Sequence, residues 1–175
     1  MKTYLETERL ILRELLPSDD IGMFELDSDP EVHRFVGKKP VKHIDESRLM
    51  IENIRKQYIM NGIGRWAVIL KSTNEFIGWS GIKYITELIN NHQGFYEIGY
   101  RFIQKHWGKG YATEAGLVFV DLAFNEMKVE NLYAYADAGN IGSRNILEKL
   151  GMHYVNSFEY QGEEEVWYEM KNPNL

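Results

Sequence analysis

A short run of small residues between a predicted strand and a predicted helix is the segment best suited to chemistry. Glycines stand at positions 108 and 110 and an alanine at position 112, directly before a strongly apolar helix expected from Thr113 onwards. Small residues let an anion approach the backbone closely, and the free N–H groups and dipole of a helix N-terminus stabilise negative charge there. A phosphate or pyrophosphate group is therefore the expected occupant.

Two familiar phosphate-binding motifs do not fit this loop. The dinucleotide fingerprint requires a third glycine where the sequence has Thr113, and it follows the first strand of its fold rather than a late one. The P-loop requires Gly-Lys-Ser/Thr after four spacer residues, a run that is missing here. Because glycine turns between a strand and a helix are common without any ligand, the loop by itself leaves a plain turn open as the alternative.

Four ordered segments of the chain resemble the GNAT superfamily of N-acetyltransferases, in particular the branch that contains the ribosomal-protein N-terminal acetyltransferases. Residues 107–115 are similar to the acetyl-CoA loop of that superfamily, with a tryptophan at position 107 that is usual in this branch. The other segments resemble its first strand (7–13), its early helix (29–32) and its second cofactor motif (140–152). Agreement of four motifs in order and spacing is far more specific than one glycine loop.

The resemblance implies an α/β fold with a mixed, mostly antiparallel sheet flanked by helices and splayed by a bulge in the cofactor strand. It implies acetyl-CoA as co-substrate, with no metal, and direct attack of an amine on the thioester in a ternary complex. The amide of Asn140 would reach the cofactor near its thioester end. The pyrophosphate would contact the backbone of Trp107, Gly108, Lys109, Gly110, Tyr111, Ala112 and Thr113.

Two residues are the candidates for proton transfer. An amine is protonated at pH 7 and must lose a proton before it attacks, and the resemblance places a carboxylate base where this chain has Glu97. The alternative is that Glu97 is an exposed strand carboxylate or a partner of Arg101 on the same face. Where many family members carry a tyrosine acid, this chain has Leu147. Ser143 is the best local substitute as proton donor to the departing thiolate, with an ordinary helix N-cap as its alternative.

Other titratable residues are weaker candidates. Glu159 and residues 163–165, on the last predicted hairpin, are second choices for the base, although an acidic run is more often a solvated turn. The five histidines are scattered without the spacing of metal ligands.

The hydrophobic pattern predicts the elements that position these residues. Strands are expected over residues 9–14, 65–71, 76–84, 94–103, 131–136, 154–160 and 166–170. Helices are expected from residue 17, and over residues 29–35, 44–59, 113–127 and 143–150. The order of elements predicts a mixed α/β sheet rather than a regularly alternating parallel one.

Composition narrows the function further. The chain has 175 residues, which fits one domain over 1–175, and it has no cysteine, which excludes disulfides and an acyl-cysteine intermediate. Its 26 acidic and 20 basic residues argue against broad nucleic-acid binding and favour a cationic or amine-bearing partner. Residues 1–6 contain no apolar leader, and no run approaches the roughly 18 apolar residues of a membrane span. We therefore expect a cytoplasmic protein.

The expected function is that of an acetyl-CoA-dependent N-acetyltransferase acting on a protein N-terminus or a small amine. A homodimer is common in the superfamily that the chain resembles. Two alternatives stay open: a non-catalytic CoA-binding or sensory module of the same fold, consistent with Leu147, and an unrelated binder of nucleotide phosphates. The acceptor is not identified, because a fold does not determine a substrate.

Overall fold

One mixed sheet of eight strands forms the centre of the molecule, in the order β1-β2-β3-β4-β5-β6-β8-β7. The structure is a computed structural model that describes residues 4–175, so residues 1–3 of the N-terminal segment lie outside the described residues. The strands are β1 (Tyr4–Glu6), β2 (Leu10–Glu14), β3 (Arg65–Leu70), β4 (Glu75–Ile85), β5 (Phe95–Phe102), β6 (Asn131–Asp137), β7 (His153–Tyr160) and β8 (Glu163–Lys171). All neighbours are antiparallel except β5 and β6. The predicted mixed, mostly antiparallel sheet is therefore confirmed.

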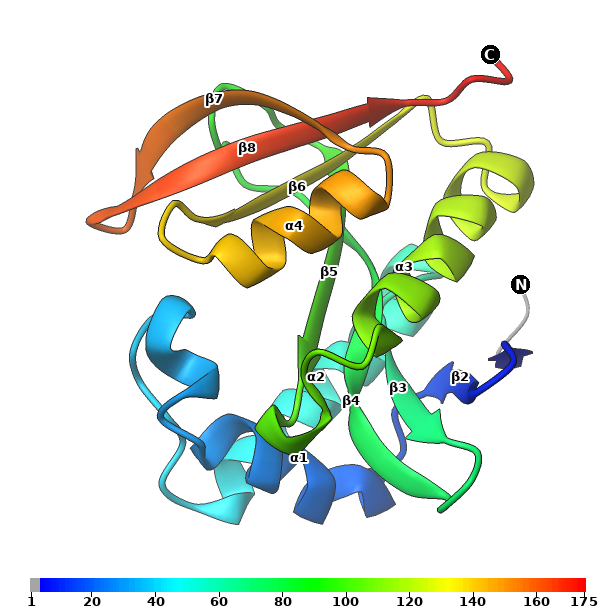
Figure 1. Cartoon of the computed structure of the whole chain (residues 1–175), viewed down its shortest axis with the longest axis vertical. Coiled ribbons are helices and arrows are strands. Elements are labelled where there is room, and N and C mark those ends of the chain that lie inside the picture. The colour runs from blue at the N-terminus through cyan, green and yellow to red at the C-terminus, as the bar shows by residue number, and fades with distance from the viewer. Residues whose placement is uncertain (1–3) are drawn as a thin grey trace.

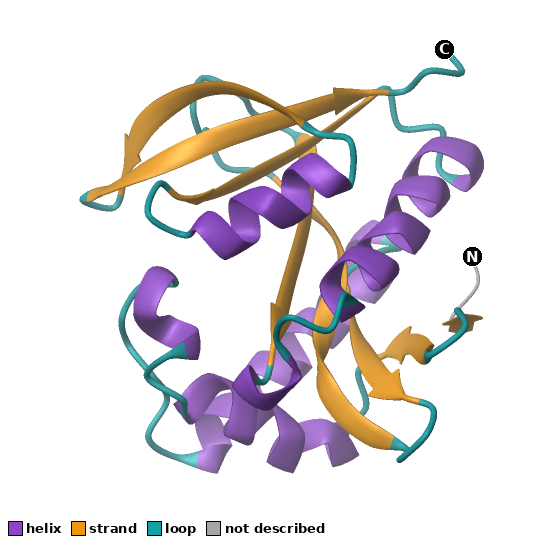
Figure 2. Cartoon of the chain, viewed as in Figure 1, coloured by secondary structure: helices purple, strands orange, loops and turns teal. Residues whose placement is uncertain are grey.

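Helices flank this sheet on its two faces (Figures 1 and 2). The α-helices are α1 (Asp20–Ser28), α2 (Ile44–Asn61), α3 (Tyr111–Asp121) and α4 (Ile141–Lys149). Short helical turns are η1 (Pro17–Asp19), η2 (Val32–Phe35) and η3 (Gln104–His106), and α3 continues into a π-helical turn, η4 (Leu122–Glu126). No helix in residues 4–175 is long and apolar enough to cross a membrane.

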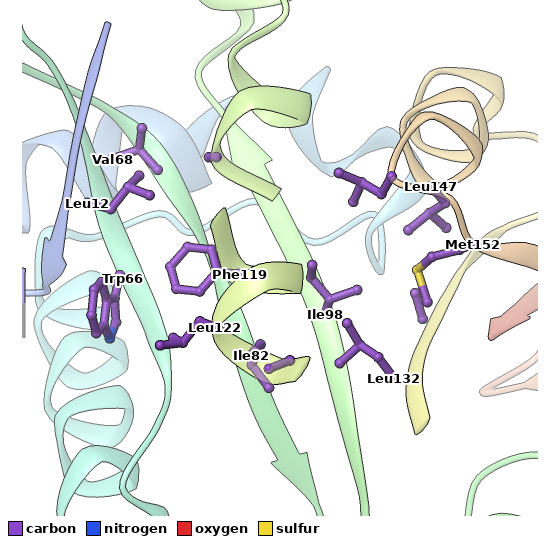
Figure 3. Close-up of a cluster of buried hydrophobic side chains, with 14 of the residues drawn as sticks. Leu12, Trp66, Val68, Ile82, Ile98, Phe119, Leu122, Leu132, Leu147 and Met152 are labelled. Carbon is purple, nitrogen blue, oxygen red and sulfur yellow. The ribbon is translucent and has the colours of Figure 1, made fainter. Parts of the chain in front are cut away.

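Alternating residues of the central strands supply two separate cores, as the two-residue period of a strand requires. From β3, Trp66 and Val68 point to the face covered by α3 and α4, where the ring of Trp66 meets Phe119 edge to face at 5.5 Å (Figure 3). The intervening Ala67 and Ile69 pack against α1 and α2 on the other face. The sheet is thus buried on both sides and forms a rigid base for the loops at its edges.

The sheet opens between β5 and β6. These two strands pair only at Tyr96↔Leu132 and Glu97↔Tyr133, whereas β6 pairs with β8 along its whole length, from Asn131↔Lys171 to Asp137↔Glu165 (Figure 1). The expected bulge is absent from the pairing of β5 with β4, which stays in continuous register from Ile85↔Phe95 to Gly78↔Phe102. The opening therefore arises because β6 diverges from β5 while it stays paired with β8, not from an extra residue in β5 against β4.

The last hairpin differs from its prediction. Residues 163–165 lie in β8, opposite residues 158–160 of β7, rather than in a solvated turn. The turn is shorter than expected because Gln161 (φ +53°) and Gly162 (φ +84°) both adopt the left-handed conformation of a two-residue hairpin. The acidic run is consequently held in the sheet.

Candidate functional site

The loop between β5 and α3 leaves a row of backbone N–H groups free. Gly108 (φ +71°) and Gly110 (φ +81°) have left-handed backbones that favour glycine, and Gly110 is the N-cap of α3. Within residues 4–175, the N–H groups from Gly108 to Thr113 donate no hydrogen bond. A Cβ added at Gly108 would meet no atom within 4 Å. These donors and the positive end of the α3 dipole provide what an anion requires.

Residues just before β2 hold this loop in place. Arg9 donates from Nη1 to the carbonyl of Lys109 (2.9 Å) and from Nε to Glu114 Oε2 (2.7 Å), and its guanidinium lies 4.6 Å from the ring centre of Tyr111. Burial alone would raise the pKa of Glu114, but the hydrogen bonds from Thr7 and Arg9 outweigh it and hold that pKa below its ordinary value. A charged Glu114 in the first turn also suits the helix dipole. Sequence analysis missed this clamp.

A cavity of about 530 Å³ lies beside the free N–H groups and extends to the η2 segment. The charged residues that line it are Arg34, Arg101, Lys149 and Glu31. Two of the three cations have a carboxylate partner, because Arg34 lies 3.8 Å from Glu31 and Arg101 binds the buried Asp27 at 2.6 Å. Lys109 is the one predicted loop residue that does not line it; the lining residues from the loop and α4 segment include Trp107, Gly108, Gly110, Tyr111, Ala112, Thr113, Asn140 and Ser143.

The N-terminus of α4 presents Asn140 and Ser143 to this cavity. Asn140 Oδ1 accepts from the N–H of Ser143 (3.0 Å), so Asn140, not Ser143, is the N-cap of α4. Its Nδ2 has no partner within residues 4–175 and is free to donate to a ligand. Ser143 Oγ lies 3.1 Å from the hydroxyl of Tyr100, which donates to the Ser143 carbonyl (2.8 Å). Burial raises the pKa of Tyr100, which therefore keeps its proton at neutral pH.

Leu147, which stands where many family members carry a tyrosine acid, is 2% exposed and packs in the core. The hydroxyl nearest to Ser143 on the cavity wall is instead that of Tyr100, which comes from β5. Its position in an alternating apolar strand made it look like a core residue, and sequence analysis missed it.

Glu97 lies at the point where β5 and β6 part. It is 7% exposed, pairs with Tyr133 in the last register position of these strands, and does not line the cavity. Its Oε2 binds Arg65 Nη2 at 2.9 Å. Glu97 is therefore neither an exposed carboxylate nor a partner of Arg101. Because side chains alternate along β5, Glu97 and Tyr100 lie on opposite faces, and the structure does not bring Glu97 to Ser143.

A second buried ion pair lies on the same face as the first. Arg101 Nη1 binds Asp27 Oδ1 at 2.6 Å, and Asp27 is fully buried at the end of α1. The guanidinium carbons of Arg65 and Arg101 lie 4.7 and 5.2 Å from the ring centre of Trp79. Cation–π contacts with one indole thus connect the two pairs. Arg65 and Glu97 are 32 residues apart in the sequence, and Asp27 and Arg101 are 74 residues apart. No local sequence pattern could therefore predict either ion pair.

Several carboxylates lie close together at the end of β6, where Asp137 pairs with Glu165 of β8. Glu165 is half-buried opposite Asp137, and burial, together with the charges of Asp137 and Glu163, raises its pKa to about 7. Glu163 itself pairs with Lys38 (2.6 Å). In the described part of the chain, no three His, Cys, Asp or Glu side chains come together as a metal site.

The raised pKa makes Glu165 a source of pH-dependent stability. The folded chain binds this proton more tightly than the unfolded chain, so Glu165 destabilises the fold as pH rises from about 4.5 to about 7 and beyond. Glu165→Gln cannot ionise and should raise the free energy of unfolding at pH 8 by about 1 kcal/mol after solvent screening, or Tm by about 3 °C. Thermal unfolding at pH 4 should show no difference, and Glu159→Gln is the control. An equal effect at both pH values would contradict the assignment.

Comparison with known proteins identifies a matching family model and several similar sequences. A family model described as an acetyltransferase (GNAT) domain matches residues 9–153. The uncharacterized protein YkkB of Bacillus subtilis is 35% identical over 99% of this chain and 98% of its own length. The uncharacterized N-acetyltransferase p20 of Bacillus licheniformis is 32% identical over 90% of this chain and 83% of its own length.

Among solved structures, the ribosomal L7/L12 alpha-N-protein acetyltransferase RimL, in complex with coenzyme A, is similar with a TM-score of 0.80 and 15% identity. The similarity covers 96% of this chain and 97% of RimL. At that identity the likeness concerns the fold alone.

Proposed function

This chain belongs to the GNAT acetyltransferase family, and we propose that it transfers the acetyl group of acetyl-CoA to a primary amine by direct attack in a ternary complex. GNAT enzymes use acetyl-CoA, and one structural neighbour holds coenzyme A. The observation that carries the proposal for this chain is the row of free N–H groups from Gly108 to Thr113 at the edge of a cavity of about 530 Å³.

The residues present fit this co-substrate. The N–H groups of residues 108–113 would hold the pyrophosphate, with Trp107 beside them on the cavity wall and Lys109 contributing through its backbone. The free Nδ2 of Asn140 would donate to the amide-bearing pantetheine arm. Bound acetyl-CoA supplies an activated thioester, and a CoA thiolate is a tolerable leaving group near neutral pH.

Two groups of this chain would move protons. Glu97 would accept the proton of the incoming amine through water, because it lies where β5 and β6 part but does not itself line the cavity. Ser143 would donate to the sulfur that departs and recover a proton from solvent, and the Tyr100 hydroxyl, which donates to the Ser143 carbonyl and lies 3.1 Å from Ser143 Oγ, would hold Ser143 in place. These roles replace the tyrosine acid that Leu147 cannot provide.

We place the chain near the ribosomal-protein branch of the family and the acceptor among protein N-termini and small amines. Support comes from Trp107 and the residues after it, and from the shared fold of RimL, which acts on a ribosomal protein according to its name. The acceptor itself is the subject of the next subsection.

Binding and turnover test the proposal separately. Acetyl-CoA at 100 times its Kd should stabilise the fold by about 2.7 kcal/mol and raise Tm by roughly 5 °C or more. A panel of N-terminal peptides, polyamines, amino acids and aminoglycosides should then release free CoA with at least one acceptor. Stabilisation without turnover would favour a non-catalytic CoA-binding module, and tighter binding of ATP or NAD than of CoA would favour an unrelated nucleotide site.

A further inference from the structure

The cavity extends beyond the region that the pyrophosphate would occupy. Residues 31–36, which include η2, line the same cavity as the α3 loop, together with Arg101 of β5. In Figure 1 this segment lies across the opening from α4. Lys149 belongs to α4, beside the loop, whereas Arg34 and Arg101 belong to the η2 side. The cavity therefore includes cationic residues that the pyrophosphate would not contact.

Arg101 is held in a fixed orientation by buried groups. Its Nη1 donates to the fully buried Asp27 at 2.6 Å, and its guanidinium lies over the ring of Trp79. His33 Nε2 lies 3.4 Å from the same carboxylate oxygen of Asp27. An arginine fixed in this way loses little conformational entropy when it binds a ligand.

One edge of the Arg101 guanidinium is unused. Within residues 4–175, Nε and Nη2 of Arg101 make no hydrogen bond, and neither is a buried unsatisfied atom. The side chain keeps 16% of its surface exposed. Nε and Nη2 together form the side edge of the fork, whose two parallel N–H groups match a carboxylate. The unused edge of a preorganised cation in a cavity is what recognition of an anionic group requires.

We propose that Arg101 is a specificity-determining residue that binds a carboxylate of the acceptor. The acceptor is then a primary amine that also carries a carboxylate: a free amino acid, or a short peptide with a free C-terminus. This inference rests on the proposed acetyl transfer and adds the acceptor class to it. It keeps the amine-bearing partner expected from net charge and adds a carboxylate to it.

Matched pairs of acceptors test the assignment. Free amino acids and dipeptides are compared with their C-terminal amides at saturating acetyl-CoA, and kcat/KM is measured for each member of a pair. The acid of the preferred pair should exceed its amide by about 50-fold, since a paired charged hydrogen bond separates them. Whether amino acids or dipeptides show the preference identifies the source of the carboxylate.

Variants assign the preference to Arg101. Arg101→Gln should reduce the acid-to-amide ratio to below about 3, and Arg101→Lys should leave an intermediate ratio because it keeps charge but loses the fork. The ratio does not depend on the fraction of folded enzyme, so it remains valid if the unpaired Asp27 lowers stability. Arg13→Gln is the matched control: it breaks another partly buried guanidinium–carboxylate pair, with Asp19, away from the cavity, and should keep the wild-type ratio.

The outcomes separate the two levels of the proposal. Equal kcat/KM for acids and amides, or an acid preference that persists in Arg101→Gln, overturns the role of Arg101 while acetyl transfer stands. A Kd for coenzyme A that rises tenfold or more in Arg101→Gln would show that this residue serves the cofactor and would also overturn it. Failure of every acceptor to release CoA would overturn the proposed function itself, and the inference with it.

Discussion

Replacing Gly110 with valine is expected to weaken coenzyme A binding by more than about 100-fold. Gly110 has φ +81°, and its nearest neighbour to an added Cβ is Arg9 Nη2 at 3.4 Å, so the protein itself nearly accommodates a side chain. A branched residue at this φ must change the backbone, which turns the N–H groups of the α3 N-terminus away from the anion. Losing two charge-assisted hydrogen bonds, each of about 1.5–3 kcal/mol, gives the stated factor.

Isothermal titration with coenzyme A measures this loss, and Gly162→Val is the matched control. Gly162 has the same left-handed backbone (φ +84°) and no atom within 4 Å of an added Cβ, but it lies in the β7–β8 turn. Both variants should lose similar stability, whereas only Gly110→Val should lose binding. A Kd for Gly110→Val within threefold of the wild type would mean that the loop does not hold the pyrophosphate.

Short-range patterns in the sequence were sufficient to predict most elements. Alternation of apolar residues located β2 and β5, and the spacing of apolar residues in 44–59 located α2, because each pattern reflects burial of one face. Two β-rich runs on either side of a turn signal located β3 and β4. The π-helical turn after α3 and the true start of β8 were missed. Both depend on local backbone geometry, in particular the left-handed Gln161 and Gly162, that apolar periodicity does not encode.

Only part of the site could be predicted from the sequence, for a different reason. The glycine loop is contiguous in sequence, so its small residues and the following helix were visible together. The side-chain pairs that shape the site join distant segments: Arg9 reaches Glu114, and Arg101 reaches Asp27. Which arginine takes which carboxylate depends on sheet order, and the incorrect pairing of Glu97 with Arg101 followed from considering one strand alone. Arg65, on β3, reaches Glu97 across β4.

The same long-range order explains the opening of the sheet. A bulge is a local irregularity of one strand, and the resemblance to known motifs predicted one in the cofactor strand. The structure instead keeps β5 paired with β4 along its length and separates β6 from β5 by pairing it with β8. The space for a ligand is thus created by the choice of partner for β6, which no segment of sequence specifies by itself.

Replacing Glu97 with glutamine is expected to lower kcat by about 100-fold at pH 7 without changing the Kd for coenzyme A. General base catalysis contributes roughly 100-fold or more, and Glu97 does not line the cavity in which the cofactor would lie. Glutamine keeps the shape of the side chain and can still accept one hydrogen bond from Arg65. The deficit should shrink as pH rises towards the pKa of the acceptor amine, because an amine that is already neutral needs no base.

Asp19→Asn distinguishes this role from a loss of stability. Asp19 is 6% exposed and binds Arg13 through two hydrogen bonds of 2.8 Å at the end of β2, so its loss also disrupts a partly buried ion pair. Both variants should lose Tm, but only Glu97→Gln should lose kcat with a pH-dependent deficit. A deficit in Glu97→Gln that is the same at every pH would make Glu97 a structural partner of Arg65. The base would then be sought among the carboxylates around Glu165, whose pKa of about 7 is matched to the task.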